Sequence, residues 1–140
     1  MNELRSELPT HAVARDARPL WERFQLMPRG PGVRAAQRLC DVVAMATASA
    51  FAVPIGELIA SSRRSPYVAF ARQSAMYLTH VTFGLSYSEV ARGFGRDRTT
   101  AAYACQLIEE RREDPAIDAV LGSLEDACGA LRRRLSAPVQ

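Results

Sequence analysis

Residues 84–106 read GLSYSEVARGFGRDRTTAAYACQ, and this stretch decides the fold. It predicts a short helix, a tight turn and a longer helix. Ser86 and Glu89 fit a capping box, because the serine can accept from an amide of the first turn while the glutamate reaches back. Gly93 and Gly95 are expected to end the short helix. This order of elements is the layout of a helix-turn-helix.

The start of the longer helix carries side chains suited to DNA. Asp97 is a good N-cap, and Arg98, Thr99 and Thr100 follow it. In a helix-turn-helix, the first turn of the second helix meets base edges in the major groove. Arginine can fork onto guanine, and threonine offers a hydroxyl group and a methyl group that matches the one on thymine. The alternative is an ordinary capped helix whose first turn faces solvent.

The rest of the chain also has a helical pattern. Apolar residues recur at steps of three and four residues, and no strand-like alternation extends beyond a few residues. Pro54 breaks the first helix, and Ser65 with Pro66 is a typical start for another. The sequence therefore predicts an all-α fold of about six helices.

One domain is predicted over residues 33–136. Residues 1–32 end in MPRGPG, which has the composition of a linker, and they are predicted to form a flexible tail. Residues 137–140 are predicted to be a short C-terminal tail.

The last predicted helix carries apolar residues in a seven-residue repeat. Its members are Ile117, Leu121, Leu124, Cys128, Leu131 and Leu135. The repeat has two interpretations. It could pack on its own domain, or it could form a seam over residues 117–135 for another helix, including one from a second copy of the chain.

The basic charge is concentrated in one region. The chain of 140 residues has a net charge of only +3, but residues 63–98 hold six arginines against two acidic residues. Such a concentration indicates a surface for an anion such as nucleic acid. All eighteen basic residues are arginine, which makes bidentate contacts to guanine or phosphate that lysine cannot copy.

The sequence lacks the usual signatures of an enzyme. There is no GxxxxGK[ST] phosphate loop and no GxSxG motif. His80 has no nucleophile motif nearby and is predicted to be structural. Three widely spaced cysteines and two histidines argue against a zinc site and against a disulfide framework. We therefore expect no catalysis, no cofactor and no bound metal.

The location is predicted to be the cytoplasm, in association with the nucleoid. The N-terminal residues have no apolar core of a signal peptide, and the longest uncharged runs are too short to span a membrane.

Residues 72–113 resemble the C-terminal DNA-binding domain of DnaA, the bacterial chromosomal replication initiator. The family pattern runs roughly RQ-x-AMYL, then a leucine-serine-x-x-E-I-G helix, then FGGRDHTTV-x-HAC. The matching segments here are RQSAMYL, LSYSE, FGRD, TT and AC. The resemblance covers about Val33 to Leu124. It implies a fold like domain IV of DnaA, of the Trp-repressor type.

The resemblance also implies a set of DNA-binding residues. It implies that a basic loop with Arg64, and Arg63 beside it, enters the minor groove, where a narrow groove attracts arginine. It further implies contacts from an arginine-glutamine pair and from the start of the recognition helix. The full candidate set is Arg63, Arg64, Arg72, Gln73, Arg96, Asp97, Arg98, Thr99 and Thr100.

Three departures from the family pattern stand out. The paired glycine of the family is the single Gly95 here, so the turn is one residue shorter. Arg98 replaces a histidine, and Ala101 replaces a valine. No ATPase domain precedes this one, so ATP-driven filament assembly is not expected of the chain.

The leading hypothesis is a sequence-specific double-stranded DNA-binding module that acts in replication or transcription control. The alternative is an adaptor that has kept the fold but binds a protein, either the replication initiator or its regulatory ATPase. The seven-residue repeat at 117–135, the aromatic tail at 21–26 and the altered turn favour the adaptor.

Overall fold

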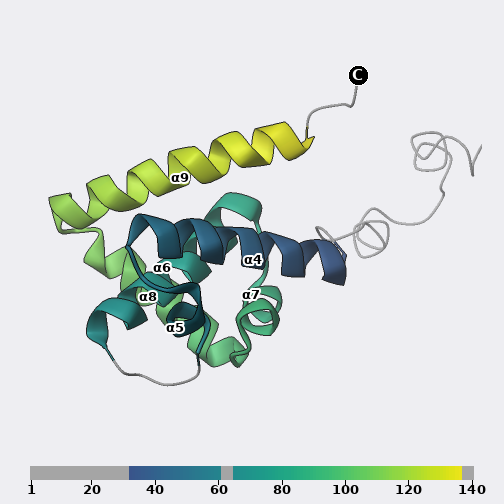
Figure 1. Ribbon diagram of the computed structural model, residues 1–140, viewed down its shortest axis with the longest axis horizontal. Coiled ribbons are helices and arrows are strands. Elements are labelled where there is room, and N and C mark those ends of the chain that lie inside the picture. Colours follow the sequence, from purple (N-terminus) through teal and green to yellow (C-terminus); the bar gives the residue numbers. More distant parts are fainter. Residues whose placement is uncertain (1–31, 61–64, 137–140) are drawn as a thin grey trace, which may run out of the picture.

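The computed structural model describes residues 32–60 and 65–136. Within them the chain forms six helices and no strand, so the predicted all-α class is confirmed (Figure 1). They are α4 (Val33–Ala50), α5 (Ile55–Ile59), α6 (Pro66–Phe83), α7 (Tyr87–Phe94), α8 (Arg98–Arg111) and α9 (Pro115–Ser136). The predicted tails lie outside the described residues, except for Gly32.

Helix α6 is the centre of the molecule, since it packs against each of the other five helices. Its face is rich in small residues, and Ala71, Ala75 and Leu78 are fully buried. Every neighbouring helix adds apolar side chains to this core. The large fully buried members are Val43, Leu58, Met76, Leu78, Leu85, Val90, Ile108 and Leu121. Burial of this apolar surface is the main stabilising contribution to the fold.

The predicted helix starts are confirmed by their hydrogen bonds. The Tyr67 amide donates to the Ser65 hydroxyl oxygen at 3.2 Å, with Pro66 in the first turn of α6. At α7 the Glu89 amide donates to the Ser86 hydroxyl at 3.1 Å, and the Ser86 amide donates to the Glu89 carboxylate at 2.9 Å. These bonds satisfy amides that a helix start leaves without a partner.

Helix α9 packs along the domain and runs over α4 in the opposite direction (Figure 1). Leu121 and Cys128 are buried, whereas Leu135 is 64% exposed. Ile117 and Leu124 pack against the core. The seven-residue repeat therefore faces its own domain over most of its length, and its last member lies in solvent.

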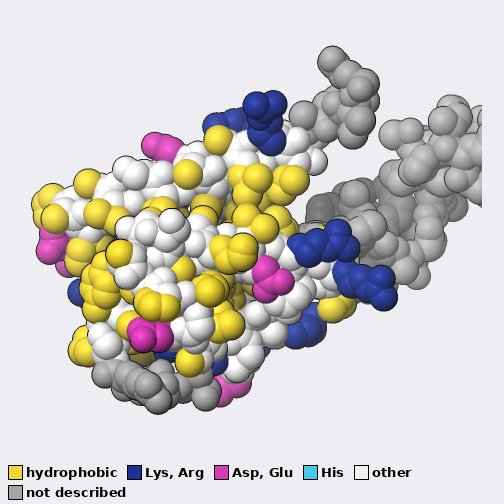
Figure 2. Space-filling view, viewed as in Figure 1, with side chains coloured by type: hydrophobic (Ala, Val, Ile, Leu, Met, Phe, Trp, Pro, Cys, Tyr) yellow, Lys and Arg dark blue, Asp and Glu magenta, His cyan; other side chains and the backbone are white. Residues whose placement is uncertain are grey.

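A small apolar cleft of about 80 Å³ remains between α4 and α9. Thr47 lines this cleft, and its buried hydroxyl oxygen has no hydrogen-bond partner. Val42 and Met45, on the same helix, are exposed. Figure 2 shows apolar side chains over α4 and along its border with α9.

The junction of α8 and α9 is held by Arg112. Its guanidinium group donates to Asp118 at 2.6 Å, to Glu125 and to the Tyr77 hydroxyl at 3.2 Å. The charge run EERRED at residues 109–114 would form a solvated helix face by its composition alone. Arg112 departs from this expectation, because α9 folds back over it and leaves it only partly exposed.

Two classes of feature are absent from the residues that the structure describes. No helix among them is long and apolar enough to cross a membrane. Likewise, no group of three or more His, Cys, Asp or Glu side chains in that part could hold a metal ion.

Candidate nucleic-acid interface

The turn between α7 and α8 has three residues, Gly95 to Asp97. Gly95 lies in the left-handed region with φ of 64°. Its amide donates to the Arg92 carbonyl at 3.3 Å, and the Arg96 amide donates to the Ala91 carbonyl at 2.8 Å. This pair of bonds is the Schellman motif, which ends a helix at a left-handed glycine. A single glycine is therefore sufficient for a tight turn.

Gly93 does not end α7 as expected, because the helix continues to Phe94. Its role is close packing. A Cβ atom at this position would lie 2.2 Å from the Cys40 Sγ atom of α4 and 2.7 Å from its Cβ atom. The Gly93 carbonyl also accepts from the Gln37 side chain at 3.1 Å. The sequence alone could not show this, because the partner lies about fifty residues earlier in the chain.

Asp97 caps α8 as predicted. Its carboxylate accepts from the Thr100 amide at 2.7 Å. This hydrogen bond holds the pKa of the exposed carboxyl below its usual range, because it favours the charged form. Arg98 and Thr99 are exposed and Thr100 is partly exposed. The cap thus fixes the helix start and leaves the next side chains available.

Arg98 lies beside an aromatic pair. Its guanidinium carbon is 5.8 Å from the centre of the Tyr87 ring. Tyr87 stacks on His80 at 4.4 Å, and the Nδ1 atom of His80 lies 2.7 Å from the Leu85 carbonyl oxygen. These contacts support the predicted structural role of His80. They also place the exposed Arg98 next to a ring face, where a cation is favourable.

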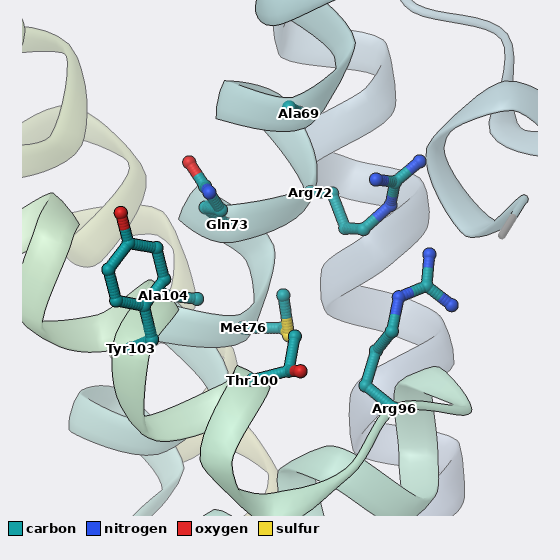
Figure 3. A pocket seen from close by; sticks show the side chains of 8 residues that line it. All are labelled: Ala69, Arg72, Gln73, Met76, Arg96, Thr100, Tyr103 and Ala104. Carbon is teal, nitrogen blue, oxygen red and sulfur yellow. The ribbon is translucent and has the colours of Figure 1, made fainter. Parts of the chain in front are cut away.

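A cavity of about 330 Å³ lies between α6, α8 and the turn (Figure 3). It is lined by Ala69, Arg72, Gln73, Met76, Arg96, Thr100, Tyr103 and Ala104. Four of the predicted DNA-binding residues therefore lie around one hollow. Arg63 and Arg64 lie outside the described residues, so the prediction for them stays a prediction.

Two of the predicted residues are engaged inside the protein. Arg72 is only 6% exposed, and its Nε atom donates to the Leu58 carbonyl at 2.6 Å. Arg96 donates to the Ala60 carbonyl at 2.6 Å. Sequence patterns did not indicate that both arginines would reach α5.

Tyr103 was missed from the sequence. It is 59% exposed and lies one turn beyond Thr99 and Thr100 on α8, at the edge of the cavity (Figure 3). The only signal was its spacing, since side chains three and four residues apart share a helix face.

A family model described as bacterial dnaA protein helix-turn-helix matches residues 40–108. Residues 40–108 therefore form a helix-turn-helix domain of the DnaA C-terminal type. The matched segment begins in α4 and ends in α8, so it contains the turn, the exposed helix start and the cavity.

Two initiator proteins illustrate the relationship. The chromosomal replication initiator protein DnaA of Thermodesulfovibrio yellowstonii is 35% identical over 68 residues, covering 47% of this chain and 16% of the relative. The DnaA protein of Rippkaea orientalis is 33% identical over 98 residues, covering 69% of this chain and 21% of the relative. The chain therefore spans only a small part of the length of these DnaA proteins.

The fold is also similar to a solved structure. The crystal structure of a DNA replication initiation factor superposes with a TM-score of 0.63 at 26% identity. The superposition covers 69% of this chain and 30% of the other. The helical arrangement is thus that of the DnaA helix-turn-helix domain.

Proposed function

We propose that this protein binds double-stranded DNA through the start of α8 and acts in the control of replication initiation or of transcription. The observation that carries the proposal is the first turn of α8. The Asp97 cap fixes that turn, while Arg98 and Thr99 remain exposed, in a segment that matches the DnaA family.

The chemistry of this turn fits base reading. Arg98 supplies a planar fork for guanine, and Thr99 and Thr100 supply hydroxyl and methyl groups. Gln73 extends from α6 beside the same cavity and can donate to a phosphate (Figure 3). In this proposal Arg98, in place of the family histidine, brings a planar guanidinium group with several donors to the start of α8.

The test is fluorescence anisotropy with two labelled duplexes of equal length. One is enriched from a random-sequence library by this protein, and the other is its shuffled sequence. We expect salt-dependent binding to both and tighter binding to the enriched duplex. Loss of a base-reading side chain in Arg98→Ala or Thr99→Ala should reduce discrimination by about 1–3 kcal/mol.

Arg132→Ala is the matched control, since this exposed arginine lies near the C-terminal end of α9. It should leave discrimination unchanged. Failure of the wild-type chain to bind either duplex at low salt would refute the proposal. Binding that Arg98→Ala and Thr99→Ala leave intact would instead refute the assignment of the site.

The replication role has its own test. Chromatin immunoprecipitation with sequencing should show enrichment at the replication origin if the protein acts on initiation. Enrichment at promoters alone would support transcription control.

The adaptor function retains one supporting observation, the exposed Val42 and Met45 beside the cleft of α4 and α9. Recovery of replication proteins in a pull-down after nuclease treatment would support it. The inward packing of Leu121 and Cys128 favours DNA binding instead, because it occupies most of the seam that a partner helix would need.

A further inference from the structure

Helix α5 has only five residues, from Ile55 to Ile59. A helix this short is not stable alone, because nucleation costs more than one turn of hydrogen bonds returns. Its end leaves carbonyl groups without partners inside the helix. Apart from burial of Leu58, other parts of the chain must therefore hold it in place.

Two arginines from different elements supply those partners. Arg72 of α6 donates from Nε to the Leu58 carbonyl at 2.6 Å and from Nη2 to the Glu57 carbonyl at 3.1 Å. Arg96, from the turn between α7 and α8, donates from Nη2 to the Ala60 carbonyl at 2.6 Å. Cationic donors are favourable at this end of a helix, which carries partial negative charge.

Arg96 also binds its own turn. Its Nη1 atom lies 3.2 Å from the Phe94 carbonyl oxygen and 3.4 Å from that of Gly95. One guanidinium group thus joins the end of α5 to the last residue of α7 and to the left-handed glycine. A lysine could not make this set of contacts, because its single ammonium group lacks the planar fork.

We propose that Arg72 and Arg96 are positioning residues. They hold α5 against the turn between α7 and α8 and so fix the orientation of α8, the recognition helix. The proposal rests on the proposed DNA binding. It differs from the prediction that these two arginines contact DNA themselves. In Figure 3 both guanidinium groups lie on the same side of the cavity, away from Gln73 and Tyr103.

The two roles predict different salt behaviour. An arginine that binds phosphate affects all duplexes alike, and its loss lowers the salt slope by about one. A positioning arginine affects base reading, so its loss weakens the enriched duplex more than the shuffled one and leaves the slope unchanged. Lysine should substitute well at a phosphate contact but not at the carbonyl contacts described above.

The experiment compares Arg96→Lys, Arg96→Gln and Arg72→Lys with the wild-type chain on both duplexes over a salt series. We expect each variant to lose about tenfold in affinity for the enriched duplex, the scale of a charged hydrogen bond, with an unchanged slope. Retained affinity in Arg96→Lys, or a slope lowered by about one in Arg96→Gln, would overturn the role of Arg96. Affinity for the enriched duplex that Arg72→Lys retained would overturn the positioning role of Arg72.

Amide hydrogen exchange tests, in the absence of DNA, whether the arginine contacts stabilise the end of α5. In Arg96→Lys the Ala60 amide, which donates to the Glu57 carbonyl at 3.3 Å, should exchange faster. The amide of buried Leu78 should be unchanged if the variant stays folded. Equal protection of the Ala60 amide in wild type and Arg96→Lys would contradict the stabilisation of α5 by Arg96. If the wild-type chain bound no duplex, the proposed function would be refuted. The exchange experiment would still decide whether Arg96 stabilises the end of α5.

Discussion

Asp97 shows how one carboxylate fixes the start of a helix. The Thr100 amide donates to it and holds the pKa of the carboxyl below its usual range. A lowered pKa means that the unfolded chain takes up the proton first as the pH falls. The stabilisation is therefore present above the ordinary range of an aspartate pKa and is lost as the pH falls through the lower, folded value.

Asp97→Asn tests this at the residue scale. Asparagine also caps helices but carries no charge. We expect wild type to be the more stable at neutral pH, and the difference in thermal midpoint should shrink in acid. A difference that stayed constant down to pH 3 would show that the charge of Asp97 does not contribute.

The thiols give a second prediction at this scale. Burial raises the pKa of Cys40 and of Cys105 to about 11. Because the thiolate is the reactive species, both should react slowly with Ellman's reagent at pH 8 in the folded chain. Unfolding in guanidinium should expose them to rapid reaction. Fast reaction of either thiol in the native protein would contradict its burial.

Whether a hydrogen bond could be predicted from the sequence depends on how far apart its two partners lie along the chain. The sequence predicted the caps at Ser65, Ser86 and Asp97, because their partners lie within three residues. It did not predict the partners of Arg72 and Arg96. Their carbonyl acceptors at the end of α5, on Glu57, Leu58 and Ala60, lie 14 to 36 residues away, and only the packed fold brings them together.

At the scale of helices, the close approach of α4 and α7 depends on Gly93. An alanine there would place its Cβ atom 2.2 Å from the Cys40 Sγ atom. We expect Gly93→Ala to lower the free energy of unfolding by about 1–3 kcal/mol, as overpacked cores do. Chemical denaturation monitored by circular dichroism would measure the change.

Gly122→Ala is the matched control. Gly122 lies inside α9, and the nearest atom to a new Cβ is the Arg112 Nη2 atom at 4.0 Å. Alanine should therefore stabilise that helix by about 0.5–1 kcal/mol. If Gly93→Ala left the free energy of unfolding unchanged or raised it, as Gly122→Ala should, the packing role of Gly93 would be disproved.

For the whole molecule, the two ends of the α9 repeat differ. Leu121 is fully buried and Leu135 is 64% exposed. Leu121→Ala should lower the free energy of unfolding by about 2–5 kcal/mol, and Leu135→Ala should change it by less than about 0.5 kcal/mol. Light scattering after size exclusion should give the same mass for wild type and Leu135→Ala. A change in mass would reveal self-association through this end of α9.

The buried, unpaired hydroxyl group of Thr47 marks a position where a substitution should stabilise the protein. Valine has nearly the same shape and the same stiffness in a helix, but it brings no polar atom into the apolar cleft. Thr47→Val should raise the thermal midpoint, since an unsatisfied polar group would be gone. A chain with a higher free energy of unfolding could tolerate destabilising substitutions that would unfold the natural sequence, including substitutions of Arg72 and Arg96.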